Sequence, residues 1–576
     1  MAVSAGRFTG NQPEPCSRRD FLARAGRGGA ALALSGALGG VLLDGCGTGP
    51  ADGGLATDQV LRVPLSSDPG TLDVNLQQWS YEAQVGRNMF ETLLRPKVDL
   101  SDVEGAAAES WLVSPDGLTW TFTLRRDGRW SDGKPVVARD FLYAFQRMLD
   151  PSLGAPYAGV LQGIVKGGEQ ARGIHPHDTA AVQQYLRTLA ITAADDHTLV
   201  VGLQRPDPTF KWVLASWATA PVRDDVVTTD PTGWASNPRT AVSNGWFRLA
   251  EHVPQHHVTL VPNDHYWGAR PKLARLLMPV IRDEHQAYAA YQRGELDMAA
   301  VPLSETARAR GHPDLVKERR LTVTALALNT LAPPFDNARL RQAFARAIDR
   351  GHLVSDVLFG RGVATTAPIP SGIDGFSASL AGSQQFDPTT ARKLFDDAGV
   401  TRATVNALRL DFRSDLPTAR TVAEFVANQL NANLGLSIQT NAVEAPALGQ
   451  HFSSGQFAMM TMADAGTGSP DQQAWLDAFV SPAGPTSRGR NGSGYTNPGY
   501  DRMVQQADVT LDPSRRGQLY LEAQRMVCDD APLVFLYQEV GWCLVKKHVK
   551  GTVPLPIDDN PFVGDVDTPA IYITRQ

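Results

Sequence analysis

The 576-residue sequence has few of the features that mark common enzymes and integral membrane proteins. Only four cysteines occur, and beyond residue 45 no apolar run approaches the roughly 20 residues that cross a bilayer as a helix. The G-x-S-x-G, H-E-x-x-H and phosphate-loop motifs are missing, and so is a pair of C-x-x-C motifs. These absences argue against a serine hydrolase, a zinc protease, a nucleotide-binding enzyme and a multispanning membrane protein.

Clustered positive charge is also missing. The formal net charge is −6, and residues 1–45 hold five arginines and three acidic residues, so the rest of the chain carries about −8. A nucleic-acid partner would need a basic patch, so we expect no nucleic acid. The roughly 530 residues beyond the leader exceed the 250–300 at which a single core stops growing, which predicts two or three domains.

The first 45 residues have the layout of an export signal. Ser17–Leu22 (SRRDFL) resembles the twin-arginine pattern S-R-R-x-F-L. The apolar run Ala30–Leu43 is too short to span a bilayer and has the proportions of a signal-peptide core. We therefore predict that residues 1–45 are a signal peptide of the twin-arginine type.

The leader ends at a candidate lipid attachment site. Leu43–Cys46 (LDGC) resembles a lipobox, in which cleavage precedes a cysteine that carries diacylglycerol, although Asp44 stands where a small or aliphatic residue is usual. Residues 46–56 are small and polar enough for a flexible tether. We expect the mature chain to begin at Cys46 and to be extracytoplasmic, either as a membrane-anchored lipoprotein or free in the periplasm.

The other cysteines have no catalytic setting. Cys16 leaves with the leader, so Cys528 and Cys543 remain in the body of the chain. Export permits a disulfide between them. Two buried thiols are the alternative, because cysteine is among the most buried residue types. A structural role is expected in either case.

The body of the chain alternates between strand and helix patterns. Residues 118–124 alternate apolar side chains with threonines, which predicts a strand with one buried face. Helical spacing follows at 137–150 and recurs in three amphipathic stretches closed by glycines, at 337–351, 388–399 and 422–435. Such alternation indicates an α/β fold in which helices cover sheets.

No group of side chains has the spacing of a metal or catalytic site. His252, His256 and His257 are the best metal candidates, but His256 and His257 would point to opposite faces of a strand, which favours surface histidines on a hairpin. The pairs Asp195–Asp196 and Asp396–Asp397 match a turn and an exposed helix face. We predict no catalytic residue, no bound metal and no cofactor.

The stretch Ala108–Pro151 closely resembles the signature block of the family 5 solute-binding proteins, the oligopeptide- and dipeptide-binding components of ABC importers. Six further blocks agree with the family and occur in its order: VGRNMFETLL, NGWFRLAEHVPQHHVTLVPNDHYW, YQRGELDM, LALNTLAPPFDNARLRQAFARAIDR, YTNPGYDRMVQQA and DDAPLVFLYQEVGWCLVKKHVKG. The resemblance runs from about Leu61 to about Gly551. It implies an extracytoplasmic receptor that captures di- and oligopeptides and delivers them to the permease of an ABC transporter.

The resemblance implies an α/β fold of the class II periplasmic-binding-protein type, with two lobes joined by a hinge. An additional α/β domain would pack on the first lobe. The expected segments are 57–96, 205–324 and 530–576 for lobe I, 97–204 for the extra domain and 325–529 for lobe II. Crossings near Thr324 and Asp529 would form the hinge, where few residues absorb closure. Closure removes a ligand from water, so its charges need fixed partners.

The resemblance also suggests ligand contacts. Gln78, Trp79 and Ser80 occupy the place of a strand-like segment that meets the ligand backbone in oligopeptide binders. Tyr157, within DPSLGAPYAGVLQ, matches a family tyrosine that faces the ligand. A tyrosine that packs between domains is the alternative reading of Tyr157.

Charged anchors for a peptide are only partly matched. The family aspartate that holds the peptide ammonium precedes a proline in a loop that is here MADAGTGSPDQQAWLD. Gly466 takes its position, so the resemblance points to Asp464, two residues earlier, while Asp471 follows the proline; a solvated loop carboxylate is the alternative for Asp464. Phe452 and Thr461 stand where some oligopeptide binders have arginines for the peptide carboxylate.

Three alternatives to peptide capture remain. The departures in lobe II are compatible with a non-peptide solute, such as a sugar or a metal chelate, in the same fold. An exported hydrolase is disfavoured because no nucleophile–base pair is found. A sensory protein that serves no importer would share these sequence features. We expect a monomer whose partners are a small solute, permease subunits and, through its lipid anchor, the membrane.

Overall fold

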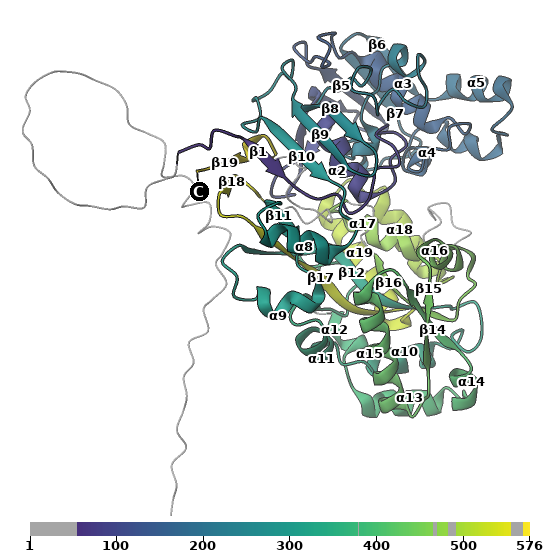
Figure 1. The fold of residues 1–576 in the computed structure, drawn as a ribbon. Coiled ribbons are helices and arrows are strands. Elements are labelled where there is room, and N and C mark those ends of the chain that lie inside the picture. Colours follow the sequence, from purple (N-terminus) through teal and green to yellow (C-terminus); the bar gives the residue numbers. More distant parts are fainter. Residues whose placement is uncertain (1–53, 378–379, 465–468, 482–490, 554–567, 576) are drawn as a thin grey trace, which may run out of the picture. The chain divides into compact units, whose positions relative to one another are not determined.

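The computed structural model describes residues 54–377, 380–464, 469–481, 491–553 and 568–575, all within one compact unit (Figure 1). The predicted signal peptide, the anchor Cys46 and most of the predicted tether lie outside these residues. Helices and strands alternate along the described chain, as predicted for an α/β fold. None of the helices in these ranges combines the length and apolar character that membrane crossing requires.

The first sheet lies near the start of the described chain. Its strands, in spatial order, are β1 (Val60–Arg62), β10 (Arg275–Pro279), β9 (His257–Pro262) and β8 (Phe247–Val253). β1 is parallel to β10, and the other neighbours are antiparallel. Helix α2 (Ser80–Met89) contacts β8, so this sheet supports the helix whose first turn carries part of the candidate site.

A second four-stranded sheet falls within residues 97–204. It contains, in spatial order, β4 (Ala108–Val113), β5 (Thr119–Leu124), β7 (Thr198–Gly202) and β6 (Ile191–Asp195), and α3 (Ala138–Leu149) packs against it. β5 and α3 confirm the strand predicted at 118–124 and the helix predicted at 137–150. One hydrophobic core joins both sheets and includes Phe122 of β5 and Phe247 of β8.

The third sheet has seven strands and contains the longest strands in the described chain. Its members, in spatial order, are β11 (Met298–Ala300), β17 (Leu533–Val545), β12 (Leu315–Leu328), β16 (Met459–Asp464), β14 (Arg409–Arg413) and β15 (Gln439–Val443), with β13 (Gly362–Ala364) also paired to β17. β12 and β17 are antiparallel over most of their length. They cross the middle of the structure in Figure 1.

Helices cover both faces of this sheet. Leu326 and Leu328 of β12 belong to one hydrophobic cluster, and Ala325 and Ala327 belong to another, because successive residues of a strand point to opposite faces. The first cluster contains residues of α10 (Ala338–Arg346), α13 (Pro388–Asp397) and α15 (Pro417–Leu434). The second contains residues of α18 (Pro498–Asp508) and α19 (Pro513–Asp530).

Two of the three predicted helix ends are confirmed. Gly435 follows α15 in a left-handed conformation with φ of 67°, and Gly399 has φ of 69° just after α13. The predicted end at Gly351 is wrong, because α10 already ends at Arg346. The side chain of Asp349 accepts a hydrogen bond from the amide of His352 and starts a separate short helix, α11 (Arg350–His352), which contains Gly351.

The two strands that would connect the predicted lobes are not regular. The β12–β17 register shifts between Arg319 and Val323 and again between Thr324 and Ala325. Thr324 was the predicted position of one hinge crossing, whereas Asp529 lies inside α19 and not on a strand. The residue opposite Thr324 is Tyr537 of β17. The lobe boundaries themselves stay a prediction.

Cys528 and Cys543 are both free, so the disulfide considered between them is not formed. Cys528 is buried in α19, and its thiol contacts the carbonyl of Thr366 at 3.4 Å. Cys543 lies in β17, opposite Ala300 and Val316 on the neighbouring strands. Burial raises the pKa of both thiols to about 12, which keeps them protonated at neutral pH. Cys528 therefore matches the alternative of a buried thiol, whereas Cys543 is only partly buried.

Candidate functional site

The segment Gln78–Ser80 leads into helix α2 and is fixed by a buried carboxylate. Trp79 is the N-cap residue, and the amides of Gln78 and Trp79 donate to Oε2 of Glu82 at 2.7 and 3.1 Å. The amide of Gly70 donates to Oε1 of Glu82 at 3.0 Å. A carboxylate in the first turn also interacts favourably with the helix dipole. Glu82 thereby holds the segment in a single conformation.

The backbone carbonyls of this segment are engaged as well. The carbonyl of Trp79 accepts from the amides of Glu82 and Ala83, each at 3.0 Å. The carbonyl of Gln78 accepts from the hydroxyl of Tyr157 at 3.3 Å. All four backbone polar groups of Gln78 and Trp79 thus have partners inside the protein. Trp79 has an extended backbone, with φ of −107° and ψ of 153°, and helix α2 begins at the next residue, Ser80.

Tyr157 is brought to the same place from residues 97–204. It precedes the short helix α4 (Ala158–Gln162), and its ring meets Trp217 edge to face, with the ring centroids 5.3 Å apart. The guanidinium of Arg87 lies 4.8 Å from the centroid of Trp217. Burial raises the pKa of Tyr157, and nearby Arg87 opposes that rise. Tyr157 therefore both packs between segments, as its alternative reading proposed, and reaches the backbone of Gln78.

A cavity of about 170 Å³ lies beside this segment, and Ser80 belongs to its wall. Helix α8 (Glu284–Gln292) and strands β11, β12 and β17 contribute other parts of the wall. The wall includes Ser80, Gln84, Glu284, Glu318, Arg320 and Trp542. Every residue of the wall falls in a segment predicted for lobe I. The sequence patterns gave no sign of this cavity, because its wall combines six distant stretches of chain.

Four charged residues line the cavity, Arg282 and Glu284 near the start of α8 and Glu318 and Arg320 on β12. Gly541 allows Arg320 to lie across β17, since a Cβ at Gly541 would be 2.8 Å from Nε of Arg320. Nη1 of Arg361 donates to the carbonyl of Val301 at 2.9 Å. Burial and the positive charge of Arg320 lower the pKa of Arg361, whereas Glu284 counteracts them. Acidic and basic groups therefore balance one another around this cavity.

The acidic anchor predicted in lobe II is described only through its backbone. Asp464 is the last residue of β16 and lies opposite Val323 of β12. Its side chain and residues 465–468 lie outside the described part of the chain. Asp471 pairs with Arg516 through two contacts of 2.7 and 2.8 Å, and its carboxylate also accepts from the amide of Gln473. Asp471 thus has a structural role at the start of α17 (Gln473–Leu476).

Thr461 and Phe452 stand at the family's arginine positions, and neither side chain carries a charge. Thr461 is buried in β16, and its hydroxyl has no hydrogen-bond partner among the described residues. Phe452 lies in α16 (Ala445–Ser454), with its ring centroid 5.8 Å from that of Phe457. Neither residue can replace the charge of an arginine.

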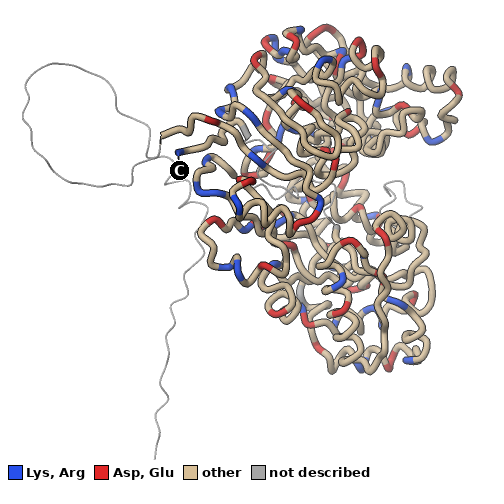
Figure 2. The backbone as a smooth tube through the Cα atoms, viewed as in Figure 1, with Lys and Arg blue, Asp and Glu red and all other residues tan. Residues whose placement is uncertain are grey.

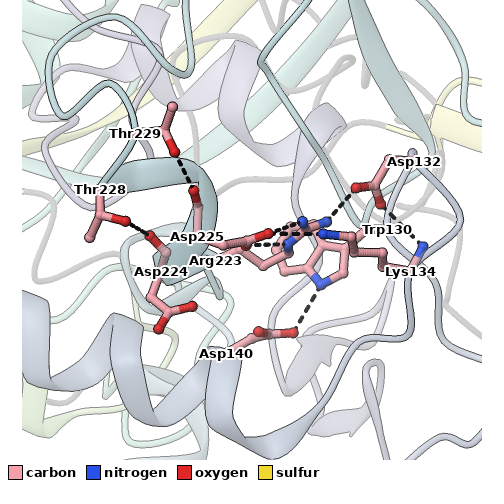
Figure 3. Close-up of polar contacts among 9 residues, drawn as sticks. All are labelled: Trp130, Asp132, Lys134, Asp140, Arg223, Asp224, Asp225, Thr228 and Thr229. Carbon is pink, nitrogen blue, oxygen red and sulfur yellow. Dashed lines mark hydrogen bonds and ion pairs between the residues drawn. The ribbon is translucent and has the colours of Figure 1, made fainter.

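A charged network that the sequence analysis missed joins residues 97–204 to the following segment (Figure 3). Arg223 contacts Asp132 at 2.6 Å and Asp225 at 2.6 and 2.9 Å, and Lys134 contacts Asp225 at 2.9 Å. The hydrogen bonds from Arg223 are the main reason that the pKa of Asp225 is lowered. All of these contacts are internal ion pairs, so the network positions the two segments and has no arrangement suited to catalysis.

Asp140 lies next to this network and accepts two hydrogen bonds. The indole Nε1 of Trp130 and the amide of Val137 both donate to Oδ2 of Asp140, at 2.9 and 3.0 Å. Burial nevertheless raises the pKa of Asp140 from 3.8 to about 6, against the effect of these bonds. Ionising the buried carboxyl of Asp140 therefore costs free energy. Its two hydrogen-bond donors, Trp130 and Val137, lie within residues 97–204, as Asp140 does.

The candidate histidines His256 and His257 contact one another. They do not point to opposite faces of a strand. Nδ1 of His256 lies 2.6 Å from Nδ1 of His257, and Nε2 of His257 lies 3.0 Å from Glu251. The prediction that these two rings point apart is wrong, because β9 begins only at His257 and His256 belongs to the preceding turn. Within the described ranges no three His, Cys, Asp or Glu side chains form a group that could hold a metal ion. Figure 2 shows Lys and Arg interspersed with Asp and Glu along the described chain.

Comparison with known proteins identifies the family. Residues 102–487 match the description "Bacterial extracellular solute-binding proteins, family 5 Middle". The dipeptide-binding protein DppE of Bacillus subtilis is 30% identical over 516 residues, which cover 87% of this chain and 90% of DppE. The chain belongs to family 5 of the bacterial extracellular solute-binding proteins.

Other proteins similar to this chain differ in what their names say they bind. The probable deoxycholate-binding periplasmic protein YgiS of Escherichia coli is 30% identical over 515 residues, covering 87% of this chain and 92% of YgiS. The solved structure of the Escherichia coli murein tripeptide binding protein MppA matches with a TM-score of 0.75 and 27% identity, covering 91% of this chain and 100% of that one. This match confirms the predicted periplasmic-binding-protein fold.

Proposed function

We propose that this family 5 protein captures di- and oligopeptides outside the cytoplasmic membrane and delivers them to the permease of an ABC importer. The similarity to DppE, a dipeptide-binding protein, and to MppA, a murein tripeptide binding protein, supports peptides as the ligand class. Binding and release without chemical change is the proposed activity, so no residue is assigned a catalytic role.

The observation that carries the proposal is the contact between Tyr157 and Gln78. Two segments that the family resemblance independently assigned to the ligand meet at 3.3 Å. The cavity lined by Ser80 opens beside them. A tyrosine and a fixed helix start at a cavity offer a peptide both an aromatic surface and hydrogen-bonding groups. We assign Gln78, Trp79, Ser80 and Tyr157 to the ligand site on this basis.

Asp464 is the proposed partner of the peptide ammonium. Its backbone ends β16 opposite Val323, three residues along β12 from Arg320, which lines the cavity. An ammonium enclosed by protein needs a carboxylate, because burying an unpaired charge is costly. The peptide would then extend from Asp464 in lobe II toward the cavity in lobe I. Closure of the lobes around the β12–β17 crossings would enclose it.

Export and anchoring are further parts of the proposal. A twin-arginine signal at residues 1–45 would carry the chain out, and Cys46 would attach it to the outer face of the membrane as a lipoprotein. A monomer is proposed as the working form, with the permease subunits as its protein partners.

A non-peptide solute is the second candidate ligand. YgiS, which is named for deoxycholate, is as similar to this chain as DppE. Thr461 and Phe452 in place of the arginines also remove the charge expected for a peptide carboxylate. These observations favour a solute that is held in the same proposed site without a carboxylate–arginine pair.

Mass spectrometry of the small molecules that co-purify with the protein tests the proposal. The protein is purified without refolding, denatured and extracted, and the extract is compared with one from a Tyr157→Ala variant. Peptides enriched in the wild-type extract are expected. A steroid, sugar or chelate enriched instead would favour the second candidate and contradict peptide capture.

A further inference from the structure

Thr209 and Gln473 form a buried hydrogen bond between two separately packed parts of the chain. Oγ1 of Thr209 donates to Oε1 of Gln473 at 2.7 Å, across 264 positions of sequence. The next residue after Thr209, Phe210, belongs to the hydrophobic core of the first two sheets. Trp475, which follows Gln473 in α17, belongs to the cluster on one face of the third sheet. The bond therefore joins two cores that share no residue.

Both ends of this hydrogen bond are buried and held by carboxylates of their own part. Thr209 is 5% exposed and Gln473 is 2% exposed. The amide of Thr209 donates to Asp207 and the amide of Gln473 donates to Asp471, each at 2.9 Å. The Thr209 hydroxyl also lies 2.6 Å from Oδ1 of Asp207, which offers it a second acceptor. The bond to Gln473 can therefore break without leaving the hydroxyl unpaired, so its loss is reversible.

Two small apolar contacts lie between the same two parts. Leu100 packs against the cluster of the third sheet. Leu511, between α18 and α19, covers the β4–β5 turn, because a Cβ at Gly117 would be 3.6 Å from both of its terminal carbons. Leu511 is still 54% exposed. A junction made of one buried polar contact and partly exposed apolar contacts is typical of domains that move relative to one another.

Each side of the junction is braced within its own part. Two residues after Thr209, Lys211 contacts Asp102 at 2.6 Å, and Asp102 lies in the same turn as Leu100. On the other side, Arg516 of α19 pairs with the acidic residue at the start of α17 at 2.7 and 2.8 Å. The two contact surfaces are thus preformed, so they can separate and meet again without rebuilding.

We propose that Thr209 and Gln473 form a latch, a hydrogen bond that is made between the lobes when they close and is broken when they open. Thr209 lies in a segment predicted for lobe I and Gln473 in the segment predicted for lobe II. This inference rests on the proposed capture of a solute by lobe closure and adds a contact that does not touch the solute. A contact that favours the closed state strengthens the binding of every ligand by the same factor.

Titration calorimetry of matched variants tests the latch. The probes are trialanine and its two analogues with leucine or glutamate at the middle position. Gln473→Met removes the acceptor with little change in shape and leaves the bond of Thr209 to Asp207 in place. Gln472→Met is the control, because Gln472 is also buried but packs against Gly375, which belongs to the same predicted lobe. Thr209→Val, alone and combined with Gln473→Met, completes a double-mutant cycle.

Gln473→Met is expected to weaken all three peptides by the same factor, about three- to tenfold, as the loss of one buried hydrogen bond would give. Dissociation of the peptides, followed by stopped flow, should become faster by a similar factor because release requires opening. Gln472→Met should bind like the wild type. The double variant should bind no more weakly than the weaker single variant, since both substitutions remove the same bond.

Equal affinities of Gln473→Met and the wild type would overturn the latch alone, and so would losses that add up in the double variant. A loss confined to one of the three peptides would also overturn it, because Gln473 would then contact the ligand. Failure of the wild type to bind any of the three peptides would overturn the peptide function together with the latch.

Discussion

The hydroxyl of Tyr157 donates a hydrogen bond to the backbone carbonyl of Gln78 at 3.3 Å, although 79 positions separate the two residues. The bond joins the segment that precedes α4 to the start of α2. Because Glu82 fixes the amides of Gln78 and Trp79, the bond connects two preformed parts of the proposed ligand site.

Removal of this hydroxyl is expected to weaken ligand binding more than folding. Tyr157→Phe keeps the ring against Trp217 and removes one exposed hydrogen bond, which should cost about 1 kcal/mol of unfolding free energy or less. Affinity for a bound peptide, measured by titration calorimetry, should fall about three- to tenfold because the carbonyl of Gln78 loses its link to Tyr157, although Glu82 still holds the amide of Gln78. Tyr185→Phe is the control, since its hydroxyl bonds the carbonyl of Gly168 in the same sheet domain. Equal peptide affinity of the Tyr157→Phe and Tyr185→Phe variants would show that Tyr157 does not belong to the site.

Neutralising Asp464 is expected to affect free-amine ligands selectively. A peptide with an ammonium terminus should bind Asp464→Asn at least about tenfold more weakly than the wild type, because a buried charge would lose its partner. The same peptide acetylated at its N-terminus should bind both proteins with similar affinity. Competition calorimetry compares the four combinations. Equal losses for both peptides would reject an ammonium-binding role for Asp464.

The free energy of unfolding is expected to decrease as pH rises, because Asp140 ionises. Burial raises its pKa from 3.8 to about 6 in the folded protein, so the folded state favours the protonated carboxyl. The stability that the protonated Asp140 carboxyl contributes is fully present below pH 3.8 and is lost as pH rises through about 6. By pH 8 the loss is on the order of 3 kcal/mol. Asp140→Asn, which can still accept from Trp130, should therefore be more stable than the wild type at pH 8 by denaturant unfolding, with the difference disappearing toward pH 4. A difference independent of pH would contradict the raised pKa.

Lipid attachment at Cys46 is tested by fractionation of cells. Cys46→Ala should move the protein from the membrane to the soluble extracytoplasmic fraction, because the diacylglycerol anchor has no other attachment point. Asp44→Ala is the matched control, since it moves Leu43–Cys46 toward the usual lipobox pattern and should leave the membrane fraction unchanged or larger. An equal membrane fraction for Cys46→Ala and the wild type would show that the protein is held there by other means.

Local periodicity accounts for the elements that the sequence predicted. The strand at 118–124 and the helices α3, α13 and α15 follow from the spacing of their apolar residues, and Gly435 ends α15 as its left-handed conformation requires. The predicted end of α10 at Gly351 is wrong. A side-chain cap at Asp349 starts a new helix there, which outweighs the stop signal of the glycine two residues later.

Long-range contacts account for what the sequence did not predict. Neither the carboxylate of Glu82 under Gln78 and Trp79 nor the cavity around Gln84 has a local signature, because their partners come from distant stretches. Family resemblance placed Gln78 and Tyr157 in one site, but the bond between them and the occupied backbone emerged only from the fold. Charge balance in the cavity likewise depends on the fold, which brings Arg282 and Glu284 near the start of α8 to the same cavity wall as Glu318 and Arg320 of β12.

Small-angle X-ray scattering, with and without a peptide identified from the purified protein, tests most directly whether the lobes close on an unmodified ligand. A saturating amount of peptide should decrease the radius of gyration, and mass spectrometry of the same sample should recover the peptide intact. Identical scattering profiles with bound peptide would contradict closure. Recovery of cleaved peptide would contradict a receptor that only binds and releases.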